Sequence, residues 1–284
     1  MPAGWFDGHV HAAPDVIARA RDDLGLVAHY LKAGAAGFVL KAHHESTVGR
    51  AHIASRISGL SVLGGVVLNH SVGGLSPATV HAALTSGGRV VWMPTVDSGV
   101  HAERQQPRLS DTEPRVPTGT LALPPVDPCA EDAARAIVGI VADHDAVLAT
   151  GHISAVECRW LVEVALAAGV RRIIATHPAY TVPDMAVDEV RALASRGVHI
   201  EITAHQLLHQ PGCTPAQLRD IAVAAGDRLL LTSDVGQVDS PTPAQALLRL
   251  GAALVAEGVD RAQVNEAMTT TPVALFLGGR SGLP

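Results

Sequence analysis

Short runs of apolar and β-branched residues recur along the chain, each bounded by glycine, proline or polar residues. Runs of this length and composition are typical of buried β-strands. We predict eight strands, over residues 5–9, 37–41, 61–68, 89–96, 146–151, 171–176, 198–203 and 228–233. Segments with helical spacing of apolar residues lie between several of them, among these residues 130–142, 155–168, 184–196 and 214–225. Strand and helix therefore alternate along the chain.

This alternation predicts the architecture. Successive strands joined by helices run parallel, because each helix returns the chain to the same end of the sheet. Eight such units in 284 residues match the size of a (β/α)8 barrel. We therefore predict an α/β protein of the TIM-barrel class, with one domain over residues 1–284. A doubly wound open sheet is the competing architecture, but the first βα turn lacks the G-x-G-x-x-G fingerprint of dinucleotide binding.

One connection is unlike the others. Residues 97–128, after the fourth predicted strand, contain six prolines and show neither helical nor strand periodicity. Long connections of this kind are usually lids or substrate-binding segments in barrels, although some are only tolerated insertions or oligomer contacts. We expect this loop to lie over the mouth of the barrel.

Composition and charge exclude several classes of protein. Hydrophobic residues make up 48% of the chain and charged residues only 17%, which excludes a disordered chain. The net charge of -6 and the lack of any basic run longer than Arg171-Arg172 argue against nucleic acid as a partner. Neither a secretory signal nor a membrane-spanning stretch is recognisable, and three widely spaced cysteines do not predict a disulfide framework. We expect a cytoplasmic protein with a small-molecule substrate and no membrane partner. The composition is compatible with a homo-oligomer.

The ends of the predicted strands carry polar residues, which is where the working residues of a β/α barrel lie. These residues are Asp7, His9 and His11 on the first strand, Lys41, His43 and His44 on the second, Asn69 and His70 on the third, His152 on the fifth, His177 on the sixth, Glu201 and His205 on the seventh, and Asp234 on the eighth. The stretch Asp7-Gly8-His9-Val10-His11 places two imidazoles on one face of a strand. Imidazole nitrogen and carboxylate oxygen are suitable ligands for Zn²⁺ and related divalent ions. A single histidine is more often a buried hydrogen-bonded residue than a ligand, but four histidines and an aspartate at the ends of strands one, five, six and eight together predict a metal site.

With this pattern the chain resembles the amidohydrolase superfamily of metal-dependent barrels. The resemblance rests on His-x-His on strand one, histidines on strands five and six and an aspartate on strand eight, together with a C-terminal TTTPVALFLG stretch at residues 269–278. It implies that His9, His11, His152, His177 and Asp234 ligate metal. It further implies that Asp234 shuttles a proton from the attacking water.

The sequence departs from the binuclear members of the superfamily at one position. Those members carry a bridging carboxylated lysine or a glutamate at the end of strand four, where this chain reads VVWMPTVD. Lys41, one of only two lysines, is the better candidate for a bridging metal ligand and catalytic residue, and Asp97 is the weaker one. A free ammonium at Lys41 is an equal alternative. We expect one or two ions, with Zn²⁺ first and Mn, Fe, Co or Ni as alternatives.

A second set of residues is expected to contact substrate or to orient ligands. It comprises His43, His44, His70 and His205, together with Arg104 and Arg108 on the long loop, which are suited to an anionic group. Glu201 is either a paired interior carboxylate or a residue that reaches the site. The position three residues after His152 holds Ala155 and not the glutamate of adenosine deaminases, which argues against a purine deaminase.

The predicted activity is hydrolysis of an amide, cyclic amide, lactone or other ester bond by metal-activated water. A phosphoester is the alternative bond, because the same water and Lewis acid serve both centres. A metal-dependent decarboxylase or related lyase on the same barrel is the alternative from another enzyme class. A binding or assembly module without catalysis is the third hypothesis.

Overall fold

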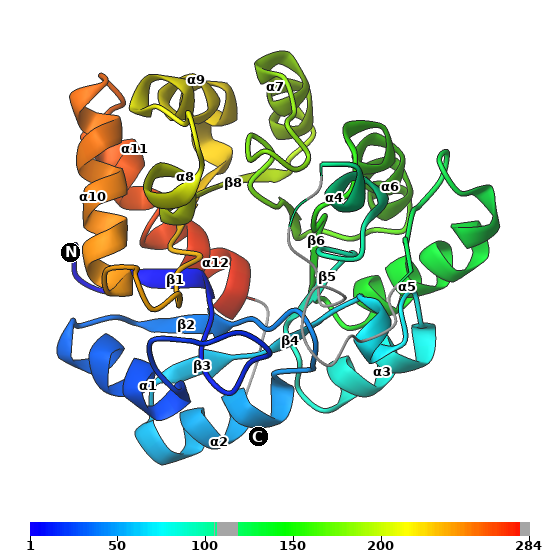
Figure 1. Cartoon of the computed structure of the whole chain (residues 1–284), viewed down its shortest axis with the longest axis horizontal. Helices are drawn as coiled ribbons and strands as arrows, with labels where there is room; N and C mark the ends of the chain where they lie inside the picture. The colour runs from blue at the N-terminus through cyan, green and yellow to red at the C-terminus, as the bar shows by residue number, and fades with distance from the viewer. Residues whose placement is uncertain (105, 107–118, 279–284) are drawn as a thin grey trace.

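Parallel strands occupy the centre of the molecule and helices cover their outer side, as the computed structural model shows (Figure 1). The structure describes residues 1–104, 106 and 119–278. The predicted α/β class with a parallel sheet is therefore confirmed.

The strands follow one another in chain order. They are β1 (Phe6–Val10), β2 (Gly37–Leu40), β3 (Ser61–Leu63), β4 (Gly65–Val67), β5 (Val90–Trp92), β6 (Val147–Ala149), β7 (Ile173–Ala175), β8 (His199–Thr203) and β9 (Leu229–Thr232). All neighbouring pairs within a sheet are parallel, and the sheets have the orders β1-β2-β3 and β4-β5-β6-β7-β8-β9. Each predicted strand is thus present, and the third is divided into β3 and β4.

Gly64 separates β3 from β4, so that one stretch of chain serves both sheets. The carbonyl oxygen of Gly64 accepts a hydrogen bond from Arg89 N at 2.8 Å, which ties the break to the start of β5. A Cβ atom at Gly64 would lie 2.7 Å from the carbonyl oxygen of Thr47. At the other end of the series, His11 N donates to Val235 O at 2.9 Å and Asp234 N donates to His9 O at 2.8 Å. The chain beyond β9 is therefore bonded to β1 and the residue that follows it.

Several helices begin at capping residues that are recognisable in the sequence. They are α1 (Asp23–Lys32), α2 (Val48–Ser58), α3 (Pro77–Thr85), α4 (Gly99–Glu103), α5 (Glu131–Asp143), α6 (Ala155–Ala167), α7 (Val187–Ser195), α8 (Ala204–His209), α9 (Pro215–Ala225), α10 (Pro243–Ala256), α11 (Arg261–Glu266) and α12 (Thr270–Leu277). Ser76 and Thr214 cap α3 and α9 through their side chains, and a proline follows each of them directly. Helix α7 begins three residues later than predicted, because Ala186 occupies its capping position and the chain before it is not helical.

The Pro-rich connection differs from the prediction in one respect. The sequence showed no regular period in residues 97–128, but Ser98 caps the short helix α4 by accepting a hydrogen bond from His101 N. Gly99 N and Leu121 O, and Leu121 N and Asp97 O, are joined by hydrogen bonds of 3.0 and 2.8 Å. The two ends of the connection are therefore held together. Residues 105 and 107–118 of the predicted loop lie outside the described residues.

The core has two parts. Apolar side chains from the inner faces of the strands form one cluster, which includes Phe6, Val67, Trp92 and Leu230 and is covered at one end by Phe276 of α12. The larger cluster lies between the strands and the helices. The TTTPVALFLG stretch thus forms a helix whose phenylalanine packs under β1, where a Cβ atom at Gly8 would lie 2.6 Å from the Phe276 ring.

None of the helices in the described part of the chain combines the length and the apolar composition that crossing a bilayer requires.

Candidate metal centre

The alternating residues of β1 have different surroundings. The Asp7 carboxylate accepts hydrogen bonds from the Tyr30 hydroxyl at 2.6 Å and from Ser233 N at 2.9 Å, so it joins α1 to the end of β9. His9 and His11 are both buried, and their Nε2 atoms lie 3.0 and 3.1 Å from the same atom, Asp234 Oδ1. The two imidazoles that the sequence placed on one face therefore meet one carboxylate oxygen.

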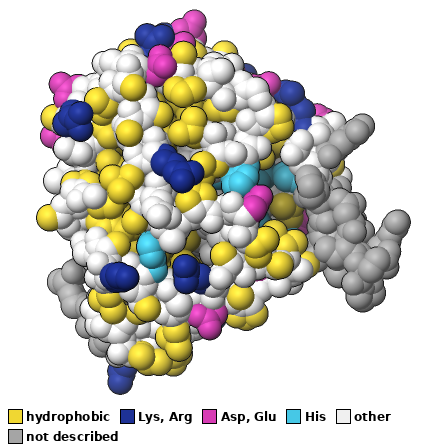
Figure 2. Space-filling view, turned by 60° about the vertical axis from the view of Figure 1, so that its left-hand side comes forward, with side chains coloured by type: hydrophobic (Ala, Val, Ile, Leu, Met, Phe, Trp, Pro, Cys, Tyr) yellow, Lys and Arg dark blue, Asp and Glu magenta, His cyan; other side chains and the backbone are white. Residues whose placement is uncertain are grey.

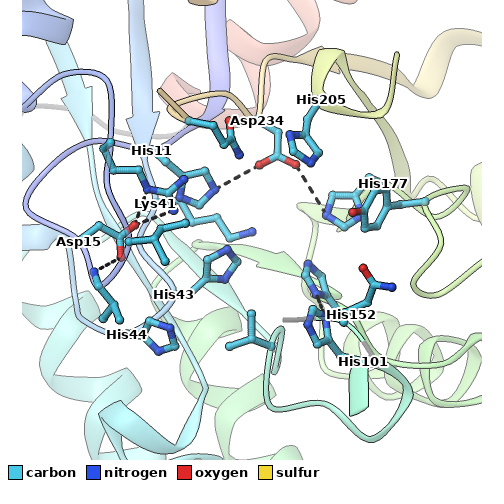
Figure 3. A pocket seen from close by; sticks show the side chains of 17 residues that line it. His11, Asp15, Lys41, His43, His44, His101, His152, His177, His205 and Asp234 are labelled. Atoms are coloured by element: carbon cyan, nitrogen blue, oxygen red, sulfur yellow. Dashed lines mark hydrogen bonds and ion pairs between the residues drawn. The ribbon is translucent and has the colours of Figure 1, made fainter. Parts of the chain in front are cut away.

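Asp234 follows β9 in a backbone conformation that is uncommon for residues other than glycine. Its φ is 50°, and the φ of His177, which follows β7, is 25°. Strained conformations of this kind persist where surrounding bonds hold them, and they are frequent at functional sites. Asp234 N donates to His9 O, and His177 N donates to Glu201 Oε2 at 3.2 Å. These bonds turn the Asp234 and His177 side chains toward each other, with His177 Nε2 4.0 Å from Asp234 Oδ2 (Figure 3).

Lys41 lies beside this group. Its Nζ atom is 3.0 Å from His9 Nε2 and 5.5 Å from the centre of the Trp92 ring, and the residue is buried. Burial lowers the pKa of Lys41, while Asp234 and Glu201 act in the opposite direction. The structure therefore places the lysine next to the first predicted ligand.

Glu201 orients His9 from the opposite side. Its Oε1 atom accepts hydrogen bonds from His9 Nδ1 at 3.1 Å and from the Thr232 hydroxyl at 2.8 Å. The sequence left open whether Glu201 is a paired interior carboxylate or reaches the site. It is buried and paired, and its partner is a predicted ligand.

His152 and His177 are adjacent, with ring centres 4.9 Å apart. His152 Nδ1 lies 3.0 Å from Nδ1 of His101, a residue of α4 that the sequence did not single out. His101 has no recognisable motif, and only the course of the Pro-rich connection brings it to the site. Neither His152 nor His177 belongs to the compact group of potential ligands among the described residues, which is His9, His11 and Asp234, with ligand atoms within 4.8 Å of one another.

A cavity of about 210 Å³ opens beside these residues. Figure 3 shows His11, Lys41 and His43 on one side of it, His152 and His177 on the other, and Asp234 between His11 and His177. In the space-filling view, histidine side chains are visible next to an acidic side chain, and hydrophobic side chains lie close by (Figure 2). The cavity is lined by His11, Asp15, Val16, Ile17, Arg19, Lys41, His43, His44, Val96, His101, Gln106, His152, His177, Tyr180, His205, Asp234 and Gln237.

The residues predicted to contact substrate are distributed unevenly. His43, His44 and His205 line the cavity, and His43 Nδ1 lies 2.8 Å from the Thr95 hydroxyl. His70 is exposed and is not among the lining residues, and Arg104 is half exposed and pairs with Asp184 at 3.3 Å. Arg108 lies outside the described residues.

Asp97, the weaker candidate for a bridging ligand, lies outside the compact ligand group. Its carboxylate accepts a hydrogen bond from His70 N at 2.8 Å, and it is absent from the cavity lining. It therefore acts at the start of the Pro-rich connection, as a turn-forming aspartate does.

Burial and charge set the protonation of the site. Burial opposes ionisation of Asp234, but His9 and the hydrogen bond from His11 outweigh it and hold the pKa of Asp234 well below its usual range. Burial lowers the pKa of His11 and His152 well below the ordinary value and lowers that of His177 to about 4. Burial acts in the same direction on His9, but the charges of Asp234 and Glu201 outweigh it and raise the pKa of His9, so a cation bound there would displace a proton. Neutral imidazoles and an ionised carboxylate are the forms that bind metal.

The arrangement of hydrogens around His9 fits a divalent cation. Glu201 accepts the proton of His9 Nδ1, which leaves a lone pair on His9 Nε2. When His9 is neutral, that lone pair faces Asp234 Oδ1 at 3.0 Å, so two acceptors point at each other, whereas an imidazolium would donate to both Glu201 and Asp234. Protonating Nε2 would instead oppose the donor on Lys41 Nζ. A cation held by His9 Nε2, His11 Nε2 and Asp234 Oδ1 removes this conflict, and Glu201 gives the histidine the outer partner usual for metal ligands.

Comparison with known families places the chain in one of them. The model of a family of unknown function (DUF6282) matches residues 4–201, which is more than half of the chain. The chain belongs to this family. The matched part includes His9, His11, Lys41, His152, His177 and Glu201, and it ends before Asp234. A search of curated proteins found no match.

Solved structures share the fold at low sequence identity. An amidohydrolase from Pseudomonas aeruginosa has a TM-score of 0.60 and 11% identity, with 96% of this chain and 95% of that chain covered. A phosphotriesterase homology protein from Escherichia coli, solved with phosphate in its active site, has a TM-score of 0.60 and 12% identity, with 97% and 99% covered. A protein engineered for organophosphate hydrolysis from a weak promiscuous lactonase template has a TM-score of 0.61 and 16% identity, with 97% and 96% covered. The resemblance to the amidohydrolase superfamily is therefore confirmed at the level of the fold.

Proposed function

We propose that the protein is a metal-dependent hydrolase that cleaves an ester, lactone, amide or cyclic amide bond of a small molecule. The observation that carries this proposal is the approach of His9 Nε2 and His11 Nε2 to one oxygen of Asp234 beside a cavity of small-molecule size. The strands would close into a (β/α)8 barrel between β9 and β1, which the two hydrogen bonds from Asp234 N and His11 N support.

His9, His11 and Asp234 would hold the ion, for which Zn²⁺ is the first candidate because imidazole and carboxylate suit it. A divalent ion in this position supplies Lewis-acid chemistry, lowering the pKa of water and polarising a carbonyl oxygen. A second ion would use His152 and His177, with Lys41 as a carboxylated bridge. As a free amine, Lys41 can donate to His9 Nε2 only while that nitrogen holds no metal, because the neutral ring has a single lone pair there. Two ions per chain together with a carboxylated Lys41 would support the bridge.

The other steps, which are proton transfer, ligand orientation and substrate binding, are assigned to different side chains. Asp234 is ionised, and its Oδ2 atom faces His177 at 4.0 Å, so this carboxylate can take a proton from water and return it to the leaving group. Glu201 keeps His9 in the tautomer with a proton on Nδ1. His43, His44 and His205 offer hydrogen bonds to substrate from the cavity wall.

Replacing Asp234 tests the proposal. In Asp234→Asn the amide keeps the shape of the side chain but does not accept the proton, so we expect turnover of a lactone or aryl ester to fall by about 10²–10⁴-fold with the fold unchanged. Asp188→Asn is the control, because Asp188 is an exposed aspartate of α7. Unchanged turnover in Asp234→Asn would overturn the assignment.

Oxygen from isotopically labelled water identifies the reaction class. A hydrolase incorporates the label into its product, whereas a decarboxylase or related lyase on the same barrel releases product without it. Phosphotriester and carboxyl ester substrates assayed side by side decide between the two bond types.

A further inference from the structure

The loop that joins β1 to α1 has a fixed shape beside the cavity. Ala13 N donates to Arg21 O and Ala20 N donates to Gly236 O, both at 2.8 Å, so both ends of the loop are held. Within it, Arg19 pairs with Asp15 at 2.6 Å, and their side chains are 2% and 3% exposed. A loop held by buried polar contacts presents its tip in a defined position.

The tip of this loop is apolar. Val16 and Ile17 are 46% and 50% exposed, and both line the cavity. Val96 and Tyr180 line the same cavity from the connections after β5 and β7. Single exposed apolar residues are ordinary on protein surfaces, but adjacent ones at the edge of a cavity are typical of a ligand-binding surface.

The arginine that lines the cavity is already paired. Arg19 is the one arginine among the described residues that line the cavity, and both its Nε and Nη2 atoms contact Asp15. Arg104, which we expected to hold an anionic group, pairs with Asp184 away from the cavity lining. Lys41 lies beside His9, within the candidate metal centre. In the described part of the chain, the wall near Val16 and Ile17 therefore favours an uncharged group over an anionic one.

We infer that the substrate carries an uncharged alkyl or aryl group that packs on Val16 and Ile17 while its reacting bond lies beside Asp234. This inference rests on the proposed function and names the substrate class of that site. Val16 and Ile17 are then specificity-determining residues. A dianionic phosphate monoester or a dicarboxylate is a poor substrate.

Hydroxamic acids of increasing chain length are suitable probes, because the hydroxamate chelates metal and leaves the chain free to contact the wall. With the Zn²⁺-loaded protein, calorimetry should show affinity rising from acetohydroxamic through hexanohydroxamic to octanohydroxamic acid. Each methylene that becomes fully buried should contribute up to about fourfold. The monohydroxamate of suberic acid, whose chain ends in a carboxylate, should bind at least tenfold more weakly than octanohydroxamic acid because its charge loses water on burial.

The double variant Val16→Ser/Ile17→Ser should lose most of the gain with chain length and keep the affinity for acetohydroxamic acid. The matched control is Leu24→Ser/Ile57→Ser, which removes two exposed apolar side chains on α1 and α2, outside the cavity lining. This control should behave like the unaltered protein.

The outcomes separate the two proposals. If acetohydroxamic acid binds but longer chains add nothing, or if the suberic acid derivative binds as well as octanohydroxamic acid, the inferred substrate class is wrong and the hydrolase proposal stands. A chain-length gain that survives in Val16→Ser/Ile17→Ser also overturns the assignment of these residues. If acetohydroxamic acid does not bind the Zn²⁺-treated protein, the metal centre is wrong and both proposals fail.

Discussion

Glu201 is the residue on which most of the candidate centre depends, although it contacts no substrate in our proposal. Its two carboxylate oxygens accept three hydrogen bonds, from His9 Nδ1, the Thr232 hydroxyl and His177 N. One side chain thus fixes the ring of a proposed ligand on β1 and the strained backbone of another after β7. Burial opposes its ionisation, but His9 and its hydrogen bond, with His177, lower the pKa of Glu201 and keep it an acceptor.

We therefore predict that Glu201→Gln weakens metal binding. Glutamine has one acceptor oxygen, so its NH₂ group must oppose either the His177 N–H or the His9 Nδ1–H. In the second case His9 moves its proton to Nε2 and loses the lone pair that faces Asp234. Partners of this kind typically contribute 10–100-fold to metal affinity, and we expect a loss of about that size in competition with a chelating dye.

Glu163→Gln is the control for this change, because Glu163 is an exposed glutamate of α6. Equal Zn²⁺ affinity in Glu201→Gln and Glu163→Gln would show that Glu201 has only a structural role.

The roles and partners of individual site residues could be predicted from the sequence only in part. The period of two in β1 identified His9 and His11, because it depends on local geometry alone. It did not show that the Asp7 carboxylate is hydrogen-bonded by Tyr30 and Ser233, since these partners come from α1 and the chain after β9. His101 was missed for the same reason.

Among the elements, the parallel strands approach one another closely where glycine stands. A Cβ atom at Gly65 of β4 would lie 2.1 Å from the carbonyl oxygen of Val90 in β5. Gly65 also pairs with Val90 in the ladder and bonds to Thr47 through its backbone. The division of the third strand at Gly64 places these contacts at the junction of the two sheets.

Gly65→Ala should consequently destabilise the protein. The added methyl group meets backbone that moves only if β4 and β5 separate, and overpacking of this kind costs about 1–3 kcal/mol. Urea unfolding followed by circular dichroism measures the change. Gly139→Ala in α5 provides the opposite case, because a Cβ atom there meets nothing within 4 Å and alanine favours a helix by about 0.5–1 kcal/mol. Equal stabilities of the two variants would contradict this account of the strand junction.

The elements themselves were largely predictable, because the apolar runs and helix caps are local signals. Helix α4 was not, since its start depends on Ser98 and its five residues carry too little periodicity among so many prolines. The division at Gly64 was missed because it depends on how Thr47 and Arg89 approach from other segments.

For the whole molecule, the candidate metal centre joins the first strand to the last. His9 and His11 belong to β1 and its end, and Asp234 follows β9, so nearly the entire chain lies between the two sides of the site. The backbone bonds from Asp234 N to His9 O and from His11 N to Val235 O connect the same two segments. A cation bound by the folded chain therefore acts as a cross-link between the ends of the fold, which the unfolded chain cannot hold in place.

Metal should accordingly raise the thermal stability of the protein. A ligand that binds only the folded state at 100 times its Kd stabilises it by about 2.7 kcal/mol. For a chain of 284 residues that corresponds to a rise in Tm of about 4–5 °C, reversed by a chelator. Differential scanning calorimetry with and without Zn²⁺ measures this rise.

Asp234→Ala and His11→Ala should abolish the rise. The control is His81→Ala/His144→Ala, which removes a ring pair of exposed histidines outside the cavity lining and should keep the rise. A rise that persists in Asp234→Ala would place the stabilising ion elsewhere, since exposed histidines also bind Zn²⁺.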